Sequence, residues 1–422
     1  MPPIRRWCNP IRAFSPLQIL APEPRRGLRQ SVYTFAMRWA QVPLERVSDF
    51  RPSFCPHRGC REHLRSKPGY RAHRHGFYAT SSGKRVRRFL CLTCGHTFSQ
   101  QTFSTSYYMK RPGLLRGIAA ALVAGSANRQ IARTLGCAPS TVSRLLARLG
   151  RHATLLHARA LRALRGRLDE PVVLDHFETF EFSQDYPFGV ATAIGARSWF
   201  VYALDPAPHR RSGRVSQAQR RRLQQRPRRP AHGGYAHSTR RAIDTVLSLV
   251  PSGGRVELRG DGHTAYDRAV RSHPQKERFS LLRYPNPRRG SKGSPRSPEA
   301  RRRDAAMFPV DLMHKIMRHS LAHHRRETIA FVRRLNAGME RLALAAVWRN
   351  FVKRRSERKA GSQTPAMMVG LASRRWRWEA VLSRRLFFDR EDLPAPWPEL
   401  YRREWATPLL PSNARHALVR GF

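Results

Sequence analysis

The sequence predicts a multidomain α+β protein, and three observations support this. Two cysteine pairs near the N-terminus flank a β-rich spacer, a stretch with helical periodicity follows, and two apolar runs farther along each lead into an aspartate. At 422 residues the chain is long enough for two or three domains with cores of their own.

The charge of the chain indicates a polyanionic partner. Lysine and arginine number 80 against 28 aspartate and glutamate residues, a formal net charge of +52 at pH 7. So large an excess brings strong self-repulsion, and nucleic acid is the polyanion that relieves it. A membrane surface is the competing partner, but no amphipathic basic helix dominates and no apolar run reaches the roughly 18 residues of a transmembrane helix. We therefore expect a cytoplasmic, nucleoid-associated protein that binds double-stranded DNA and has no membrane partner and no small-molecule substrate.

Residues 1–47 are predicted to be a disordered basic segment, because arginines stand there among prolines and scattered apolar residues. No apolar core followed by a small-residue cleavage site is present, so no signal peptide is expected. Met37 is an alternative first residue.

Residues 48–110 are predicted to form a zinc ribbon. Cys55 and Cys60 form one pair and Cys91 and Cys94 the other, so two turns can present four thiolates tetrahedrally to Zn²⁺. Four free structural cysteines are the alternative. The histidines that could replace one of these ligands are His57, His63 and His96. The spacer interleaves basic and aromatic residues, a pattern that suits contact with a nucleic-acid backbone.

Residues 111–168 are predicted to be a helix-turn-helix DNA-binding domain. Ile131 and Leu135 recur at helical spacing, Gly136 supplies the turn, and Pro139 opens a second helix with Val142 on its inner face. The outward side chains of that second helix, expected in the major groove of DNA, are Ser140, Thr141, Ser143, Arg144 and Arg148. An ordinary three-helix bundle is the alternative.

Residues 169–353 are predicted to form a ribonuclease H-like α/β catalytic domain. Strands are expected at 172–182, 188–194 and 199–204, followed by a helix at 238–249, a strand that ends at Asp261, a helix at 265–272 and a strand at 278–284. Three antiparallel strands followed by alternating helix and strand are the order of this fold. The first and fourth strands are neighbours in it, so Asp175 and Asp261 are expected to lie side by side.

Two adjacent carboxylates repel each other unless cations lie between them. Two Mg²⁺ (or Mn²⁺) ions about 4 Å apart would offset both charges and stabilise the attacking and leaving oxygens of a phosphodiester. The pair therefore predicts metal-dependent phosphoryl transfer on nucleic acid. The alternative for each acid is an aspartate at a strand end that faces water.

A third acid is expected from the helical stretch that begins near Pro309. Asp311 would lie in its first turn, where stabilisation by the helix dipole is the alternative role, and Glu327 lies farther along. Glu178 ranks lower because it lies three residues after Asp175 on a strand and so faces the opposite side. The histidines of this stretch, expected at the surface or on DNA phosphates, are His314, His319, His323 and His324.

The order of these modules resembles that of bacterial insertion-sequence transposases of the DDE type, those with a short N-terminal zinc ribbon. The matching pieces, within about residues 55–353, are Cys91-x-x-Cys94, the segment 131–142, Leu174-Asp175, Gly260-Asp261-Gly-His-Thr-Ala-Tyr266 and the segment 325–331. The resemblance implies a third acid on a helix upstream of that last segment. By position the role falls on Asp311, although the family more often has glutamate there.

The resemblance implies a DNA transposase that binds the ends of an insertion sequence, then cleaves and joins strands with Asp175, Asp261 and Asp311 as metal ligands. A homodimer or larger assembly on DNA is expected, because two ends must be held together. A metal-dependent nuclease or junction resolvase, and a DNA-binding regulator or decayed transposase, are the alternatives. Basic inserts are expected at 206–234 and 286–303. Residues 354–422 form a helical C-terminal extension without an assigned role, in which Trp376 and Trp378 are expected to pack in a small helical unit, with stacking on bases as the alternative.

Overall fold

A computed structural model describes residues 50–408, apart from 65–69, 81–84, 212, 214, 226–232, 289–290, 292 and 388–391. The predicted disordered segment 1–47, with Met37, lies outside the described residues. Within them no helix is both long enough and apolar enough to cross a membrane.

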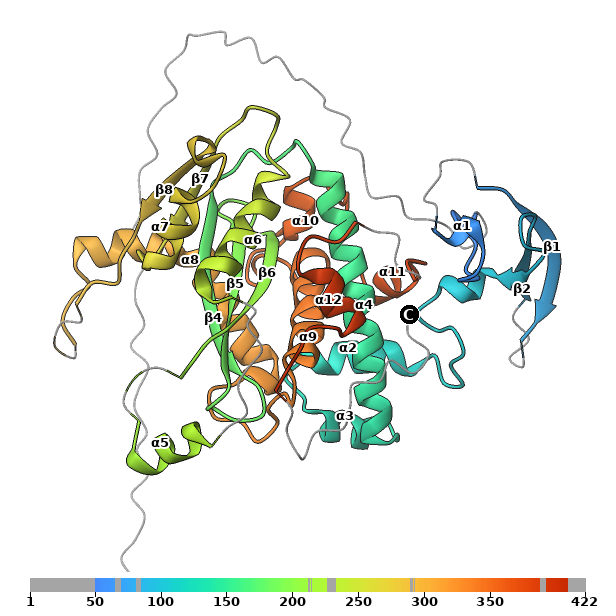
Figure 1. Ribbon diagram of the computed structural model, residues 1–422, viewed down its shortest axis with the longest axis horizontal. Coiled ribbons are helices and arrows are strands. Elements are labelled where there is room, and N and C mark those ends of the chain that lie inside the picture. The colour runs from blue at the N-terminus through green and yellow to red at the C-terminus, as the bar shows by residue number, and fades with distance from the viewer. Residues whose placement is uncertain are drawn as a thin grey trace, which may run out of the picture. The chain divides into compact units, whose positions relative to one another are not determined.

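The N-terminal module is a small antiparallel sheet, with strand order β1-β2-β3 (Figure 1). Its elements are α1 (Arg61–Leu64), β1 (Ala72–Ala79), β2 (Arg85–Cys91), β3 (Thr97–Ser99) and the 3₁₀ helix η2 (Gln100–Phe103). Its core is four phenylalanines in mutual ring contact: Phe50, Phe54, Phe89 and Phe103. So small a core buries little apolar surface, so this module needs a further source of stability.

The next module consists of three helices, α2 (Leu114–Val123), α3 (Asn128–Thr134) and α4 (Pro139–Leu164). Ile131 and Val142 are fully buried between α3 and α4, and Gly136 has a φ of 56°, as the tight turn requires. The second helix of the predicted helix-turn-helix is therefore the first part of a much longer helix, α4, which continues without a break to Leu164.

A mixed five-stranded sheet forms the centre of the third module, with strand order β6-β5-β4-β7-β8. The strands are β4 (Val172–Phe180), β5 (Pro187–Gly195), β6 (Val201–Pro208), β7 (Val256–Gly260) and β8 (Phe279–Arg283). Strands β4, β5 and β6 pair antiparallel, whereas β7 lies parallel to β4 and β8 parallel to β7. This mixed sheet is consistent with a ribonuclease H-like fold, and its first and fourth strands are neighbours as predicted.

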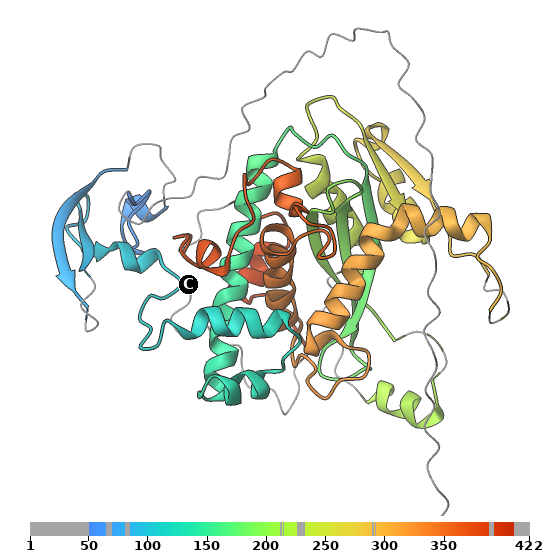
Figure 2. The ribbon, with the colours of Figure 1, turned by 180° about the vertical axis from the view of Figure 1, so that it is seen from behind.

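Helices α6 (Tyr235–Leu247) and α8 (Pro298–Ser320) cover opposite faces of this sheet (Figures 1 and 2). On α6, Arg241 holds the buried Asp205 of β6 through Nε at 2.9 Å and Nη2 at 2.6 Å. Such a paired carboxylate can be buried, because its charge is compensated and hydrogen-bonded.

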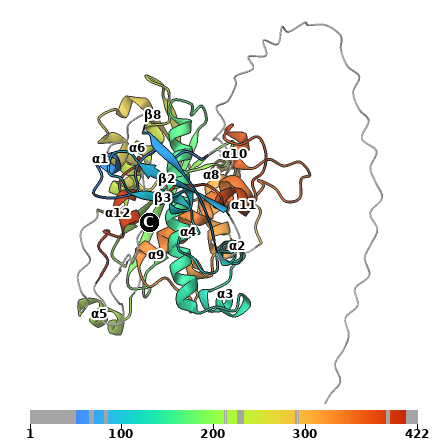
Figure 3. The same cartoon turned by 90° about the vertical axis from the view of Figure 1, so that its right-hand side faces the viewer.

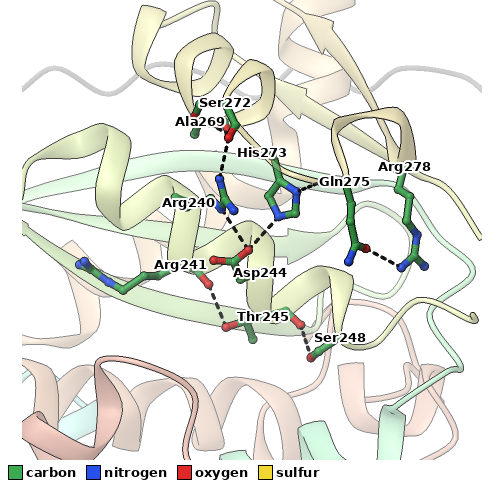
Figure 4. A network of polar contacts seen from close by, with 10 residues as sticks. All are labelled: Arg240, Arg241, Asp244, Thr245, Ser248, Ala269, Ser272, His273, Gln275 and Arg278. Carbon is green, nitrogen blue, oxygen red and sulfur yellow. Dashed lines mark hydrogen bonds and ion pairs between the residues drawn. The ribbon is translucent and has the colours of Figure 1, made fainter.

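Helix α6 also contacts α7 (Thr264–Arg271) and the turn after it through the polar network of Figure 4. Asp244 accepts a hydrogen bond from Arg240 Nε at 3.1 Å, and its Oδ1 lies 2.8 Å from His273 Nε2. Arg240 Nη1 also donates to the carbonyl of Ser272 at 3.2 Å. These contacts fix α7, which directly follows the aspartate after β7. The 3₁₀ helix η3 (Lys276–Arg278) then leads into β8.

The predicted helix start near Pro309 is wrong, because α8 begins at Pro298. Ser297 accepts a hydrogen bond from the amide of Ala300, and Pro298 stands in the first turn, where its missing N–H costs nothing. Pro309 is a buried residue in the helix interior. The predicted insert 286–303 therefore ends within this helix, and the insert 206–234 contains a helix of its own, α5 (Gln217–Gln224).

After α8 the chain passes through η4 (Ala322–His324) into α9 (Leu335–Val347), which ends in a π-helical turn, η5 (Trp348–Val352). The extension that follows contains α10 (Pro365–Met368), α11 (Trp378–Leu382) and α12 (Trp397–Arg402). Trp376 is buried and stacks on Phe351, with ring centroids 4.3 Å apart, and Trp378 is buried as well. Both tryptophans thus serve packing, and the extension shares the core of the helix-turn-helix and the five-stranded sheet.

Helices α4 and α9 lie side by side and approach closely at Gly150 (Figures 1 and 3). A Cβ at this position would lie 2.5 Å from both Cβ and the carbonyl oxygen of Glu340. Only glycine permits this backbone approach, which joins the long DNA-binding helix to the α/β module.

We expect Gly150→Ala to lower the free energy of unfolding by about 1–3 kcal/mol, because α4 and α9 must separate to admit the methyl group. Thermal or denaturant unfolding measures the loss. Gly113→Ala is the control, since a Cβ there meets nothing within 4 Å. Equal stabilities of the two variants would show that the helices adjust without cost.

Candidate functional site

Parallel pairing of β4 with β7 brings two of the predicted acids together. Val172 lies opposite Leu258 and Val173 opposite Arg259. Asp175 and Asp261 each come two residues later, so they occupy matching positions along neighbouring strands. Burial raises the pKa of Asp261 and the nearby Asp175 carboxylate adds to this effect, against a hydrogen bond from the amide of His263. The negative charges of Asp175 and Asp261 therefore repel each other at this site.

The Asp175 carboxylate is fixed by three contacts. Oδ1 accepts from the amide of His176 at 2.8 Å and from the hydroxyl of Tyr266 at 3.3 Å, and Oδ2 lies 3.5 Å from Nδ1 of His314. Burial alone would raise the pKa of Asp175, but the contact with His314 and the amide of His176 outweigh burial and leave this pKa below its ordinary value. The carboxylate is thus held ionised and oriented.

The segment Asp261-Gly-x-x-x-Tyr266 ends in a tyrosine whose hydroxyl contacts Asp175. Gly262 has a φ of 90°, which permits the sharp turn from β7 into α7. Tyr266 is then buried beneath the sheet edge, where its hydroxyl contacts Asp175 and lies 3.1 Å from Nδ1 of His176. One motif therefore supplies an acid and also a group that positions the other acid.

The third predicted acid, Asp311, lies on the helix that contacts Asp175. It precedes His314 by three residues on α8, so the two share a helix face. Because α8 begins at Pro298, Asp311 is in mid-helix, and stabilisation by the helix dipole does not explain it. Arg303, on the same helix, makes an ion pair with Asp311, and its charge also acts on Asp175 and Asp261. Glu327 is exposed in the segment between η4 and α9.

The acids offer oxygen ligands of the kind that Mg²⁺ and Mn²⁺ prefer. Asp175 and Asp261 fit a shared cation, since burial and then the charge of Asp175 raise the pKa of Asp261, and an ion between the two carboxylates would relieve their repulsion. Within the described part of the chain, however, no three acids bring oxygen atoms within 4.8 Å of one another. Asp311 can serve as a third ligand only after its ion pair with Arg303 has broken.

The ion pair of Arg303 with Asp311 and the contact of His314 with Asp175 were not predicted from the sequence. Arg303, Asp311 and His314 follow one another at spacings that place them on one helix face, a signal that was hidden by placing the helix start at Pro309. The prediction that His323 and His324 lie at the surface or on DNA phosphates is wrong, because both side chains are buried. His324 Nδ1 lies 3.0 Å from the hydroxyl of Thr179 on β4. Glu178 contacts Tyr235 of α6, on the face of the sheet away from α8.

The four predicted cysteine ligands converge in the N-terminal module. Sγ of Cys55 lies 3.7 Å from that of Cys94, and Sγ of Cys60 lies 3.9 Å from that of Cys91. Thiolates about 2.3 Å from a tetrahedral zinc ion are about 3.8 Å apart, so the cluster has the size that Zn²⁺ requires. His57 and His96 stack beside Cys94 with ring centroids 3.8 Å apart, whereas Nδ1 of His63 lies 2.8 Å from the carbonyl of Cys55. The cluster can therefore hold Zn²⁺.

The hairpin above this cluster has an exposed basic and aromatic surface. Strand β1 is exposed from His73 to Ala79. Phe77 is 44% exposed, and the guanidinium groups of Arg85 and Arg87 lie 4.6 and 4.1 Å from its ring centroid. An aromatic ring held exposed between two cations suits a polyanionic partner with flat bases.

Of the five predicted DNA-reading residues on α4, Ser140, Ser143 and Arg144 are exposed, and Thr141 and Arg148 are half-buried. Ser143 also accepts a hydrogen bond from Asn128 Nδ2 at 2.8 Å. Arg148 differs, because its Nη1 donates to the carbonyls of Thr105 at 3.0 Å and Tyr107 at 2.8 Å. It therefore anchors the segment that leads from the ribbon into α2.

We expect one tightly held zinc ion per chain, and loss of it in Cys91→Ser, because three thiolates leave one coordination position open. Metal analysis after dialysis measures the content, and the N-terminal module should become protease-sensitive in the variant. Cys137→Ser, outside the cluster, should keep its zinc. A full zinc content in Cys91→Ser would refute the assignment.

Comparison with known proteins bears on the helical module. A family model described as a helix-turn-helix domain matches residues 116–149, which span most of α2, all of α3, the turn after it and the first part of α4. No curated protein matches the chain. The chain thus contains a helix-turn-helix DNA-binding domain of the kind found in transposases.

Proposed function

We propose that the protein is a DNA transposase that binds the ends of an insertion sequence and performs metal-dependent cleavage and joining of DNA strands. The observation that carries this proposal is the pairing of β4, which bears Asp175, with β7, which is followed directly by Asp261, in one chain with a helix-turn-helix of the kind found in transposases. The net charge of +52 and the possible zinc site of the ribbon are consistent with it.

In this proposal each described residue has a distinct part. Asp175, Asp261 and, after release from Arg303, Asp311 hold divalent ions. A divalent ion held by these carboxylates would supply activation of a water molecule or a 3′-hydroxyl and would offset the charge of the phosphodiester. Tyr266 and His314 orient the Asp175 carboxylate, so they are positioning residues. Arg303 compensates the acidic charge before DNA and ions bind.

Asp261→Asn tests the reaction. We expect cleavage and joining of a plasmid carrying the DNA that flanks the reading frame to fall on the order of 10³-fold, because the variant loses several kcal/mol of metal-dependent transition-state stabilisation. Gel analysis of cleaved and joined products in Mg²⁺ or Mn²⁺ gives the rates. Asp169→Asn, at an exposed carboxylate, should react like the wild type.

An unchanged rate in Asp261→Asn would refute the assignment of the acids. Cleaved ends without joined products, in the wild type, would instead identify a metal-dependent nuclease or junction resolvase. DNA binding without any ion-dependent cleavage would leave a DNA-binding regulator or a decayed transposase.

Arg303→Gln tests whether Arg303 competes with the ions. We expect DNA-free protein to bind Mn²⁺ about fivefold more tightly, since the ion no longer has to displace a partly buried guanidinium group whose ion pair is worth roughly 1 kcal/mol. Electron paramagnetic resonance of free Mn²⁺ during titration measures the affinity. Arg302→Gln removes an exposed charge one residue away and should bind as the wild type does. Equal affinities in both variants would exclude the competition.

A further inference from the structure

A groove lies beside the DNA-binding helix, between α4 and the segment 108–114 that precedes α2. Its volume is about 930 Å³. Thr141, Arg144 and Arg148 line one side, along α4, and Arg403 at the end of α12 contributes from the C-terminal extension. Three segments distant in sequence therefore build one concave surface.

The charged side chains that line the groove, among the described residues, are all basic. Six of its side chains are basic, and none of the described residues that line it is acidic: the basic ones are Lys110, Arg111, Arg144, Arg148, Arg151 and Arg403. Burial foremost, and then the charges of Arg151 and Arg144, lower the pKa of Arg148 to about 10. This mutual repulsion is a cost that an anionic ligand would remove.

The walls of the groove are fixed by contacts within the protein. Arg148 donates to the carbonyls of Thr105 and Tyr107, and Arg111 donates to the carbonyl of Gly136 at 2.9 Å, at the turn of the helix-turn-helix. Arg403 donates from Nε and Nη2 to both oxygens of the buried Glu340, at 2.8 and 2.9 Å. The groove therefore exists before any ligand binds, so little ordering entropy opposes binding.

The size and position of the groove favour a long anion over a small one. A single phosphate would fill a minor part of 930 Å³. The groove also continues to Ser143 and Arg144, two exposed positions of the helix-turn-helix that are predicted to contact DNA. A helix seated in the major groove has a phosphodiester strand along its flank, and cationic side chains there contact phosphates.

We propose that this groove holds one phosphodiester strand of duplex DNA, with Lys110 and Arg144 on its phosphates and Arg403, which is held by Glu340, forming the part of the wall that comes from the C-terminal extension. The site deepens the DNA-binding part of the proposed function and does not depend on the acids of β4 and β7. It gives the extension, whose helices otherwise serve packing, a part in DNA binding.

Lys110→Ala in the full chain tests the proposal without divalent ions, so that cleavage plays no part. Duplex binding is measured by fluorescence anisotropy across salt concentrations. We expect weaker binding to every sequence alike, and a plot of log K against log salt whose slope is smaller by about 0.9, the value for one lost phosphate contact. Lys110→Arg should restore both. Lys359→Ala removes an exposed lysine elsewhere and serves as the control.

A second measurement uses Cys137, which lines the groove. In a Cys8→Ser background it is the one cysteine outside the four-cysteine cluster. Saturating duplex DNA should slow its reaction with a maleimide several-fold. The proposal is overturned if Cys137 reacts equally fast with and without bound DNA, or if Lys110→Ala has the affinity and salt slope of Lys359→Ala. Either result leaves the outcome for Asp261→Asn unaffected, so the two proposals fail separately.

Discussion

Parallel pairing of β4 with β7 is the constraint on which the α/β module depends. It places the carboxylates of Asp175, on β4, and Asp261, directly after β7, at matching positions, where they repel each other. The surrounding residues compensate this repulsion. Tyr266 and His314 approach Asp175 from α7 and α8, and Arg303 brings a cation toward the acids. A sheet that served only as a scaffold would have no reason to bear this electrostatic cost.

The long helix α4 connects DNA binding to the rest of the chain. Its first turns belong to the helix-turn-helix, and the same helix crosses α9 at Gly150, where backbones nearly touch. A second link runs through Asn128, whose side chain contacts Ser143 on α4 and lies 3.1 Å from Nε2 of the buried His323. Rigid connections of this kind fix where a bound duplex can lie relative to the five-stranded sheet.

Acids are scarce in this chain, and the buried ones are committed to partners. Glu340 binds Arg403, Asp205 binds Arg241, and Glu170 accepts hydrogen bonds from the amide of Ser198 and the hydroxyl of Tyr202. Cations far outnumber acids, and some of those without an acidic partner in the described part of the chain line the ribbon hairpin and the groove beside α4.

The sequence by itself determined the order of the elements and the identity of their main side chains. Apolar runs that end in Asp175 and Asp261, a glycine at the turn before α4, and two cysteine pairs are local signals, because each depends on a few neighbouring residues. Only the tertiary structure decided that Arg303 pairs with Asp311, that His314 faces Asp175, and that Arg403 lines a groove with Lys110. Those contacts join residues whose separation along the chain carries no pattern, and they follow from how helices pack on the sheet and on one another.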